Sequence, residues 1–127
     1  MQSFDELYTQ LLNWHQTKHQ FAADNTPSAA SERFLTLLTN QILLPVAEHF
    51  GQLTITYGFT GPALNRYIQR LSPAGTAPGL DQHSCCELNN KNSIICKRPG
   101  AACDFRVQGH EEQMHVIAQF ICQQLDF

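Results

Sequence analysis

Apolar residues recur at helical spacing over much of this chain, and only two short segments resemble strands. Four segments have apolar side chains three and four positions apart: residues 3–22, about 28–49, 62–71 and 111–124. Residues 52–57 alternate polar and apolar or β-branched side chains, and residues 101–107 also have the character of a strand. We therefore predict an α+β fold in which a small antiparallel sheet packs with helices.

Residues that begin or end helices support these boundaries. Ser3 is a good N-cap for the first helix, and Glu6 completes a capping box. Pro45 should interrupt the second helix because proline lacks the N–H that a helix needs. Gly51 is a common C-terminal stop, and Pro62 suits the first position of the next helix.

Length and composition restrict the class of protein. The 127 residues are enough for one domain with its own core, and 43% of them are hydrophobic against 15% charged, which excludes a disordered tail. A net charge of −3 argues against a nucleic-acid binder. No apolar run is long enough for a membrane helix, so we expect no membrane association. The first residues lack the basic start of a secretory signal, and the localisation stays unknown.

The cysteines gather in one long irregular segment, residues 72–100, and just after it. Four of the five lie close together: Cys85, Cys86, Cys96 and Cys103. No CxxC pair is present, so a zinc ribbon is a weak interpretation. Three interpretations stay open, namely two disulfides, free thiols or a Cys-bound metal. Disulfides here would also suit an unrelated α-rich interaction domain.

His83 and Asp104 are the candidate metal ligands. Histidine nitrogen and carboxylate oxygen are both ligands of zinc, and a catalytic zinc keeps a further position for water. Taken alone, the two residues are better explained as a surface histidine and a capping aspartate. His110 and His115 are candidates for a further ligand, with solvated or helix-face histidines as the alternative.

Several motifs occur in the order found in one known family. The stretch from DNTPSAASERF through LLPVAEHFGQLTITYGF reads as a helix, a Leu-Pro interruption, a glycine and a strand. GFTGPALNRYI follows, then DQH, then GAACDFRV, and finally GHEEQMHVIAQFICQQLDF. From about residue 24 onward the chain thereby resembles the zinc D-alanyl-D-alanine carboxypeptidases, whose fold is shared with the hedgehog signalling domain. DQH is similar to the family's S-x-H motif and GAACDFRV to its G-x-A-x-D-F motif.

This resemblance implies a domain organisation and a function. It implies an N-terminal helix over residues 1–23 and a carboxypeptidase-like domain over residues 24–127. His83 and Asp104 carry over as zinc ligands, which makes zinc the implied cofactor. Gly100 and Ala102 would let the backbone turn beside the metal. The implied activity is a zinc metallopeptidase acting on peptidoglycan peptides, with a peptide or peptidoglycan fragment as partner.

Three departures from the family's pattern leave an alternative open. The family's third ligand, a histidine, and its catalytic glutamate lie on later strands, so we expect the last strands and the catalytic residues to lie beyond residue 127. Thr60 stands where the family has an arginine, and the segment between His83 and Asp104 is longer than usual. The alternative is an inactive member of the same fold that serves as a binding or structural module. An open sheet edge would also make a homo-oligomer plausible.

Overall fold

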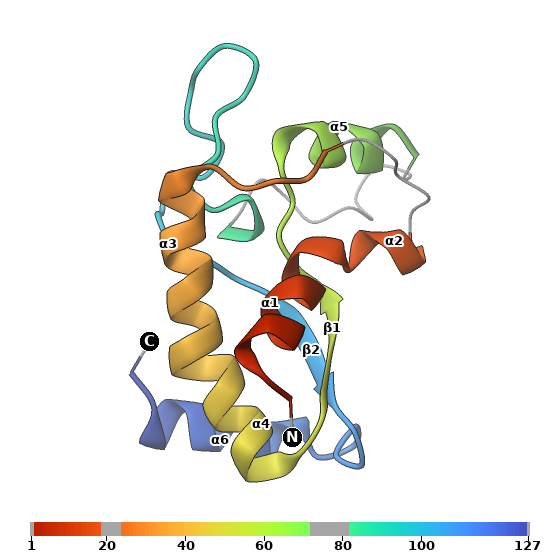
Figure 1. The fold of residues 1–127 in the computed structure, drawn as a ribbon, viewed down its shortest axis with the longest axis vertical. Coiled ribbons are helices and arrows are strands. Elements are labelled where there is room, and N and C mark those ends of the chain that lie inside the picture. Colours follow the sequence, from red (N-terminus) through yellow and green to blue (C-terminus); the bar gives the residue numbers. More distant parts are fainter. Residues whose placement is uncertain (1, 19–23, 72–81, 127) are drawn as a thin grey trace.

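The computed structural model describes residues 2–18, 24–71 and 82–126 (Figure 1). The elements are α1 (Phe4–Asn13), α2 (His15–Lys18), α3 (Ala29–Leu38), the π-helical turn η1 (Thr39–Leu43), α4 (Leu44–Phe50), β1 (Leu53–Tyr57), α5 (Pro62–Leu71), the 3-10 turn η2 (Gln82–Ser84), β2 (Asp104–Val107) and α6 (Met114–Gln124). The two strands form one antiparallel sheet. The predicted α+β class, with a small antiparallel sheet packed with helices, is confirmed.

The first helical segment is divided in two. Ser3 caps α1 as predicted, because its hydroxyl accepts a hydrogen bond from the Glu6 N–H at 3.2 Å. The helix is interrupted at Trp14, whose indole N–H donates to the Phe59 carbonyl at 2.7 Å and so ties this point to the end of β1. α2 then continues for one turn. The end of the predicted helix, residues 19–22, lies outside the described residues.

α3, η1 and α4 form one long helical rod along one side of the molecule (Figure 1). Ser28 caps its start through its side chain. The predicted interruption at Pro45 takes the form of a wider π-helical turn just before the proline. There the Leu44 N–H bonds to the Thr39 carbonyl, five residues back, which widens the helix where the proline ring must fit. Gly51 ends the rod at a φ of 119°, as its position predicts.

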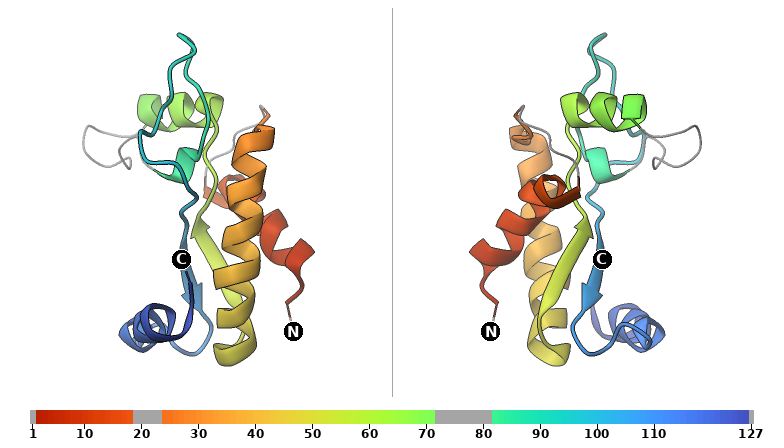
Figure 2. Two further views of the ribbon diagram at one scale, coloured as in Figure 1. Left: turned by 90° about the vertical axis from the view of Figure 1, so that its left-hand side faces the viewer. Right: turned by 90° about the vertical axis from the view of Figure 1, so that its right-hand side faces the viewer.

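The sheet is short and irregular at one end. Leu53 pairs with Val107 and Ile55 with Phe105, but the register shifts after Ile55, so that Tyr57 lies opposite Asp104. Such a bulge re-aims the side chains next to it. Figure 2 shows α1 beside β1 and, on the opposite side of β1, the strand β2. The bulge therefore sits where the two strands leave the sheet toward η2.

One hydrophobic core joins the helices and the sheet. The buried residues of this core are Leu7, Leu11, Trp14, Leu35, Ile42, Leu43, Val46, Ala47, Leu53, Ile55, Phe59, Leu64, Ile68, Cys85, Val107 and Ile117. Because α1 supplies two leucines to it, the N-terminal helix packs into the same body as α3, α5 and the sheet. Among the described helices, none has the length and apolar character needed to cross a membrane.

α6 packs against the end of α4 through aromatic rings. The His49 ring stacks on Phe120 with centroids 4.5 Å apart, and Phe50 meets Phe120 edge to face at 5.3 Å. The helix begins at Met114, three residues later than predicted, because the preceding residues form turns. Ile117 is its buried residue.

Candidate functional site

His83 lies in the turn η2 and is held by the segment that leaves β1. Its backbone carbonyl accepts a hydrogen bond from the Thr60 N–H at 2.9 Å. Its ring meets the Tyr57 ring edge to face, with centroids 4.9 Å apart. The His83 side chain is 11% exposed, so its orientation is fixed by neighbours on most sides.

Asp104 begins β2 and brings its carboxylate to the same place. Its Oδ1 lies 3.7 Å from His83 Nε2, and its side chain is 65% exposed. That distance is too long for a hydrogen bond. Two ligands of one tetrahedral zinc ion, at about 2.1 Å each from the metal, stand about 3.4 Å apart. The structure thus brings the two predicted ligands to a separation near the one a shared metal ion requires.

Neither of the other histidines considered joins them. His110 packs edge to face on Phe50, and its Nδ1 lies 3.5 Å from the Gln108 carbonyl oxygen. His115 is exposed on α6. Within the described ranges, no three histidine, cysteine or acidic side chains gather as a metal-binding group. Among the described residues, His83 and Asp104 are therefore the two candidate ligands that lie together at this place.

Gly100 packs tightly against the turn that carries His83. Its φ is +140°, a region that other residues rarely adopt, and a Cβ there would lie 3.1 Å from Gln82 Nε2. The Gln82 amide donates to the Pro99 carbonyl at 3.4 Å. The residue that Gly100 approaches closely is Gln82, which had no role in the sequence interpretation and which links the two segments.

The five cysteines are free thiols in this structure. Burial raises the pKa of Cys85 to about 12, with further contributions from Cys86 and Glu87. Burial and the neighbouring Asp104 raise the pKa of Cys103 to about 12. Because the thiolate is the reactive form, these two thiols are poorly suited to act as nucleophiles. Of the three interpretations of the cysteine cluster, the structure agrees with free thiols.

Glu87 anchors the cysteine-rich segment to the start of α3, which the sequence did not reveal. Its Oε2 accepts hydrogen bonds from the Ser28 N–H at 3.0 Å, the Ser28 hydroxyl at 2.6 Å and the Ser31 hydroxyl at 2.5 Å. Ser31 Oγ in turn accepts from the Cys86 N–H at 3.0 Å. A carboxylate at a helix N-terminus is favoured by the helix dipole. The segment that follows His83 is thereby fixed.

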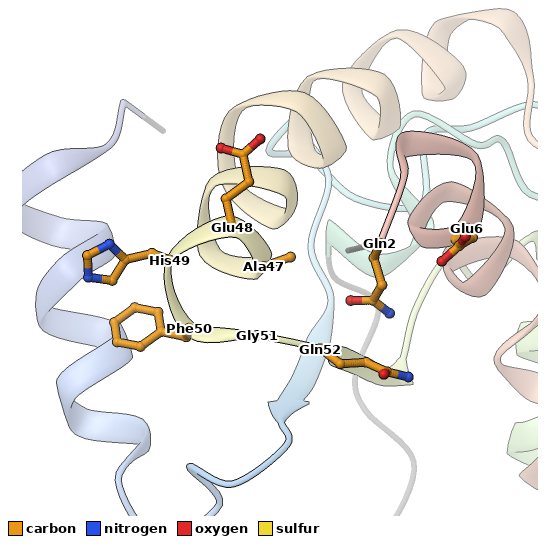
Figure 3. Close-up of a pocket in the computed structure, with 8 residues that line it drawn as sticks. All are labelled: Gln2, Glu6, Ala47, Glu48, His49, Phe50, Gly51 and Gln52. Atoms are coloured by element: carbon orange, nitrogen blue, oxygen red, sulfur yellow. The ribbon is translucent and has the colours of Figure 1, made fainter.

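A separate hollow lies at the far end of the rod, between α1 and the end of α4. Figure 3 shows its lining side chains pointing in different directions: His49 and Phe50 extend toward α6, while Glu48 and Glu6 lie apart on different helices. An acid–base pair must converge on one reacting atom. This hollow therefore offers no arrangement of that kind.

No family model, curated protein or solved structure matches this chain. The geometry of His83 and Asp104, together with the motifs that contain them, is therefore the basis for a proposed function.

Proposed function

We propose that this chain is a zinc-dependent peptidase-like protein of the D-alanyl-D-alanine carboxypeptidase type, acting on peptidoglycan peptides. The observation that carries the proposal is the separation of 3.7 Å between His83 Nε2 and Asp104 Oδ1. The two residues come from a turn and a strand that are distant in the sequence, and both lie in motifs that resemble the family's zinc motifs. The proposed fold is accordingly the hedgehog/DD-peptidase fold.

The donor set fits zinc. An imidazole nitrogen and a carboxylate oxygen are both ordinary zinc ligands, and a zinc ion bound there would polarise a carbonyl and lower the pKa of a bound water. The contacts of Tyr57 and Thr60 hold the His83 ring and backbone in place. The side chain of Asp104 is 65% exposed, so the pair is open to solvent on the Asp104 side.

Thr60 favours a second candidate function, a non-catalytic module of the same proposed fold. Its side chain is 3% exposed, and its hydroxyl donates to the Gly58 carbonyl at 3.3 Å. The position where the family places an arginine is therefore occupied by a residue that stabilises a turn and offers no positive charge to a substrate carbonyl. Such a module would bind a peptide at this surface without cleaving it.

Measurements of metal content and of peptide hydrolysis test the metal site and the two candidate functions, the peptidase and the non-catalytic module. After incubation with zinc and removal of free metal, we expect bound zinc in the wild-type protein and its loss in His83→Ala and Asp104→Asn. His115→Ala is the matched control, because His115 is exposed on α6. Absence of zinc from the folded wild-type protein would overturn the metal site.

The second measurement uses a peptide ending in D-Ala-D-Ala. Release of D-Ala that a chelator abolishes and zinc restores supports the peptidase. A protein that binds zinc through both residues, binds this peptide and releases no D-Ala behaves as a non-catalytic module.

A further inference from the structure

The charges of the described residues are strongly segregated. Residues 58–71 and 82–103 contain five cations: Arg66, Arg70, Lys91, Lys97 and Arg98. Their one carboxylate, Glu87, is buried in hydrogen bonds with α3. Most of the carboxylates of this acidic chain lie in its remaining parts. α5 and the cysteine-rich segment lie together at the upper end of Figure 1, so the molecule has one basic end.

A groove of about 300 Å³ lies between α5 and this segment. One wall is formed by Asn65, Arg66 and Gln69 of α5, and the facing wall by residues 89–91. Pro62 and Ile95 add apolar surface. Two cations and several amides thus face the same space, and the described lining residues include no carboxylate.

The wall opposite α5 is preformed by hydrogen bonds within its own turn. The Asn89 side-chain oxygen accepts from the N–H groups of Lys91 at 2.8 Å and Ser93 at 3.1 Å. A bridge between Leu88 and Ile94 closes the turn at its base. These bonds hold the turn in one conformation, which lowers the entropy cost of binding.

Arg66 is already oriented in the groove. Its Nη1 donates to Asn90 Oδ1 at 3.0 Å, which joins the two walls. A guanidinium has five N–H donors in a planar fork, so most of them stay available for a ligand. Arginine prefers carboxylate and phosphate groups because both match that fork.

We propose that this groove binds a short acidic peptide segment. A ligand carboxylate lies between Arg66 and Lys91, and the side-chain amides of Asn65, Gln69 and Asn90 hydrogen-bond to peptide groups. Nucleic acid fits less well, because single strands are usually held by stacking on aromatic side chains and the part of the lining that the structure describes has none. The net charge of −3 also opposes an extended polyanion. The proposal does not depend on zinc at His83 and Asp104.

An NMR titration tests the proposal. The probe is acetyl-Ala-Glu-Ala-Glu-Ala, and its matched control has glutamine at both glutamate positions. With the acidic peptide, we expect amide shifts concentrated in residues 62–69 and 88–95, and weaker binding at higher salt. The double variant Arg66→Gln/Lys91→Gln should weaken binding at least about tenfold, because both charge-assisted hydrogen bonds to the ligand carboxylate are lost. Arg66→Lys with Lys91 intact should retain part of the affinity.

Arg33→Gln is the control variant, because Arg33 is an exposed cation on α3 outside the groove. It should bind like the wild-type protein. Equal binding of the glutamine peptide, or shifts that fall outside the two segments, would overturn the proposal. An oligonucleotide that displaces the acidic peptide from the same residues would likewise contradict the proposal, because the surface would then be a general binding site for polyanions. Unchanged thermal unfolding of each variant shows that the fold is retained.

Discussion

The side chain of Gln2 bonds to Leu53 in the way that a neighbouring strand would. Its Nε2 donates to the Leu53 carbonyl at 2.8 Å, and its Oε1 accepts from the Leu53 N–H at 2.7 Å. Gln10 of α1 extends this pattern by accepting from the Ile55 N–H at 3.0 Å. Unpaired backbone groups at a strand edge invite pairing with another chain. Two glutamine side chains therefore cover the outer edge of β1.

Gln2→Ala should destabilise the protein by about 1–3 kcal/mol, because the Leu53 N–H and carbonyl lose their partner in a partly buried position. The free energy of unfolding in urea measures this. Gln123→Ala is the matched control, since Gln123 is exposed on α6 and should change stability little. Equal stability of the two variants would show that water replaces the Gln2 amide without cost.

Gly58→Ala should be more damaging than Gly51→Ala. A Cβ at Gly58 would lie 2.5 Å from the Leu11 carbonyl oxygen and 2.8 Å from Trp14 Cδ1, so backbone must move, at a cost of about 3 kcal/mol. Gly51 has a φ of +119° but open space around it, so alanine there meets backbone strain alone, about 1–2 kcal/mol. Urea unfolding of both variants gives the comparison. A larger loss at Gly51 would contradict the packing of β1 against α1.

Local signals in the sequence predicted most elements correctly. The helix predicted for residues 62–71 is α5 with the same bounds, because Pro62 fixes its first turn. Ser3 as a cap and Gly51 as a stop lie within three residues of the features they define, so the sequence is sufficient to find them. The α+β class follows from these elements.

Features that depend on distant residues were not predictable. Gln2 caps a strand about fifty positions away, and Glu87 caps a helix that precedes it by nearly sixty. No periodicity in the sequence marks such pairs. The proximity of His83 to Asp104 was expected from motif resemblance alone, and a metal role for them stays a prediction. The basic end was not predicted, because the net charge of −3 is a sum over the whole chain and does not show where the charges lie.

Glu87→Ala should cost about 2–4 kcal/mol. The Ser28 and Ser31 hydroxyls and the Ser28 N–H would lose their shared charged acceptor, and hydrogen bonds to charged groups are worth about 1.5–3 kcal/mol. Glu32→Ala is the control, because Glu32 is exposed in the first turn of α3 and contributes mainly through the helix dipole, about 0.3–1 kcal/mol. Urea unfolding measures both. If both variants lost the same unfolding free energy, the hydrogen bonds of Glu87 would add no stability beyond the effect of its charge.

The rate at which each cysteine reacts with a thiol reagent should decrease as its burial increases. At pH 8 we expect Cys122, which is exposed on α6, to react first with a disulfide reagent. Cys85 and Cys103 should react slowly, because burial raises the pKa of each to about 12 and leaves little thiolate. Mass spectrometry of labelled peptides identifies the sites. Cys122→Ser should remove the fast phase, and rapid labelling of Cys85 in the folded protein would contradict the burial seen here.

The same two thiols should make the protein less stable at alkaline pH. Their folded pKa of about 12 lies above the ordinary value of 9.0. Between these values the unfolded chain releases a proton that the folded protein keeps, so stability present below pH 9 is lost as the pH rises toward 12. The slope is about 1.4 kcal/mol per pH unit for each thiol. Urea unfolding from pH 8 to 10.5 measures it, and Cys103→Ala should reduce the slope by the share of one thiol. Cys122→Ser is the control, and a slope that Cys103→Ala leaves unchanged would contradict the raised pKa.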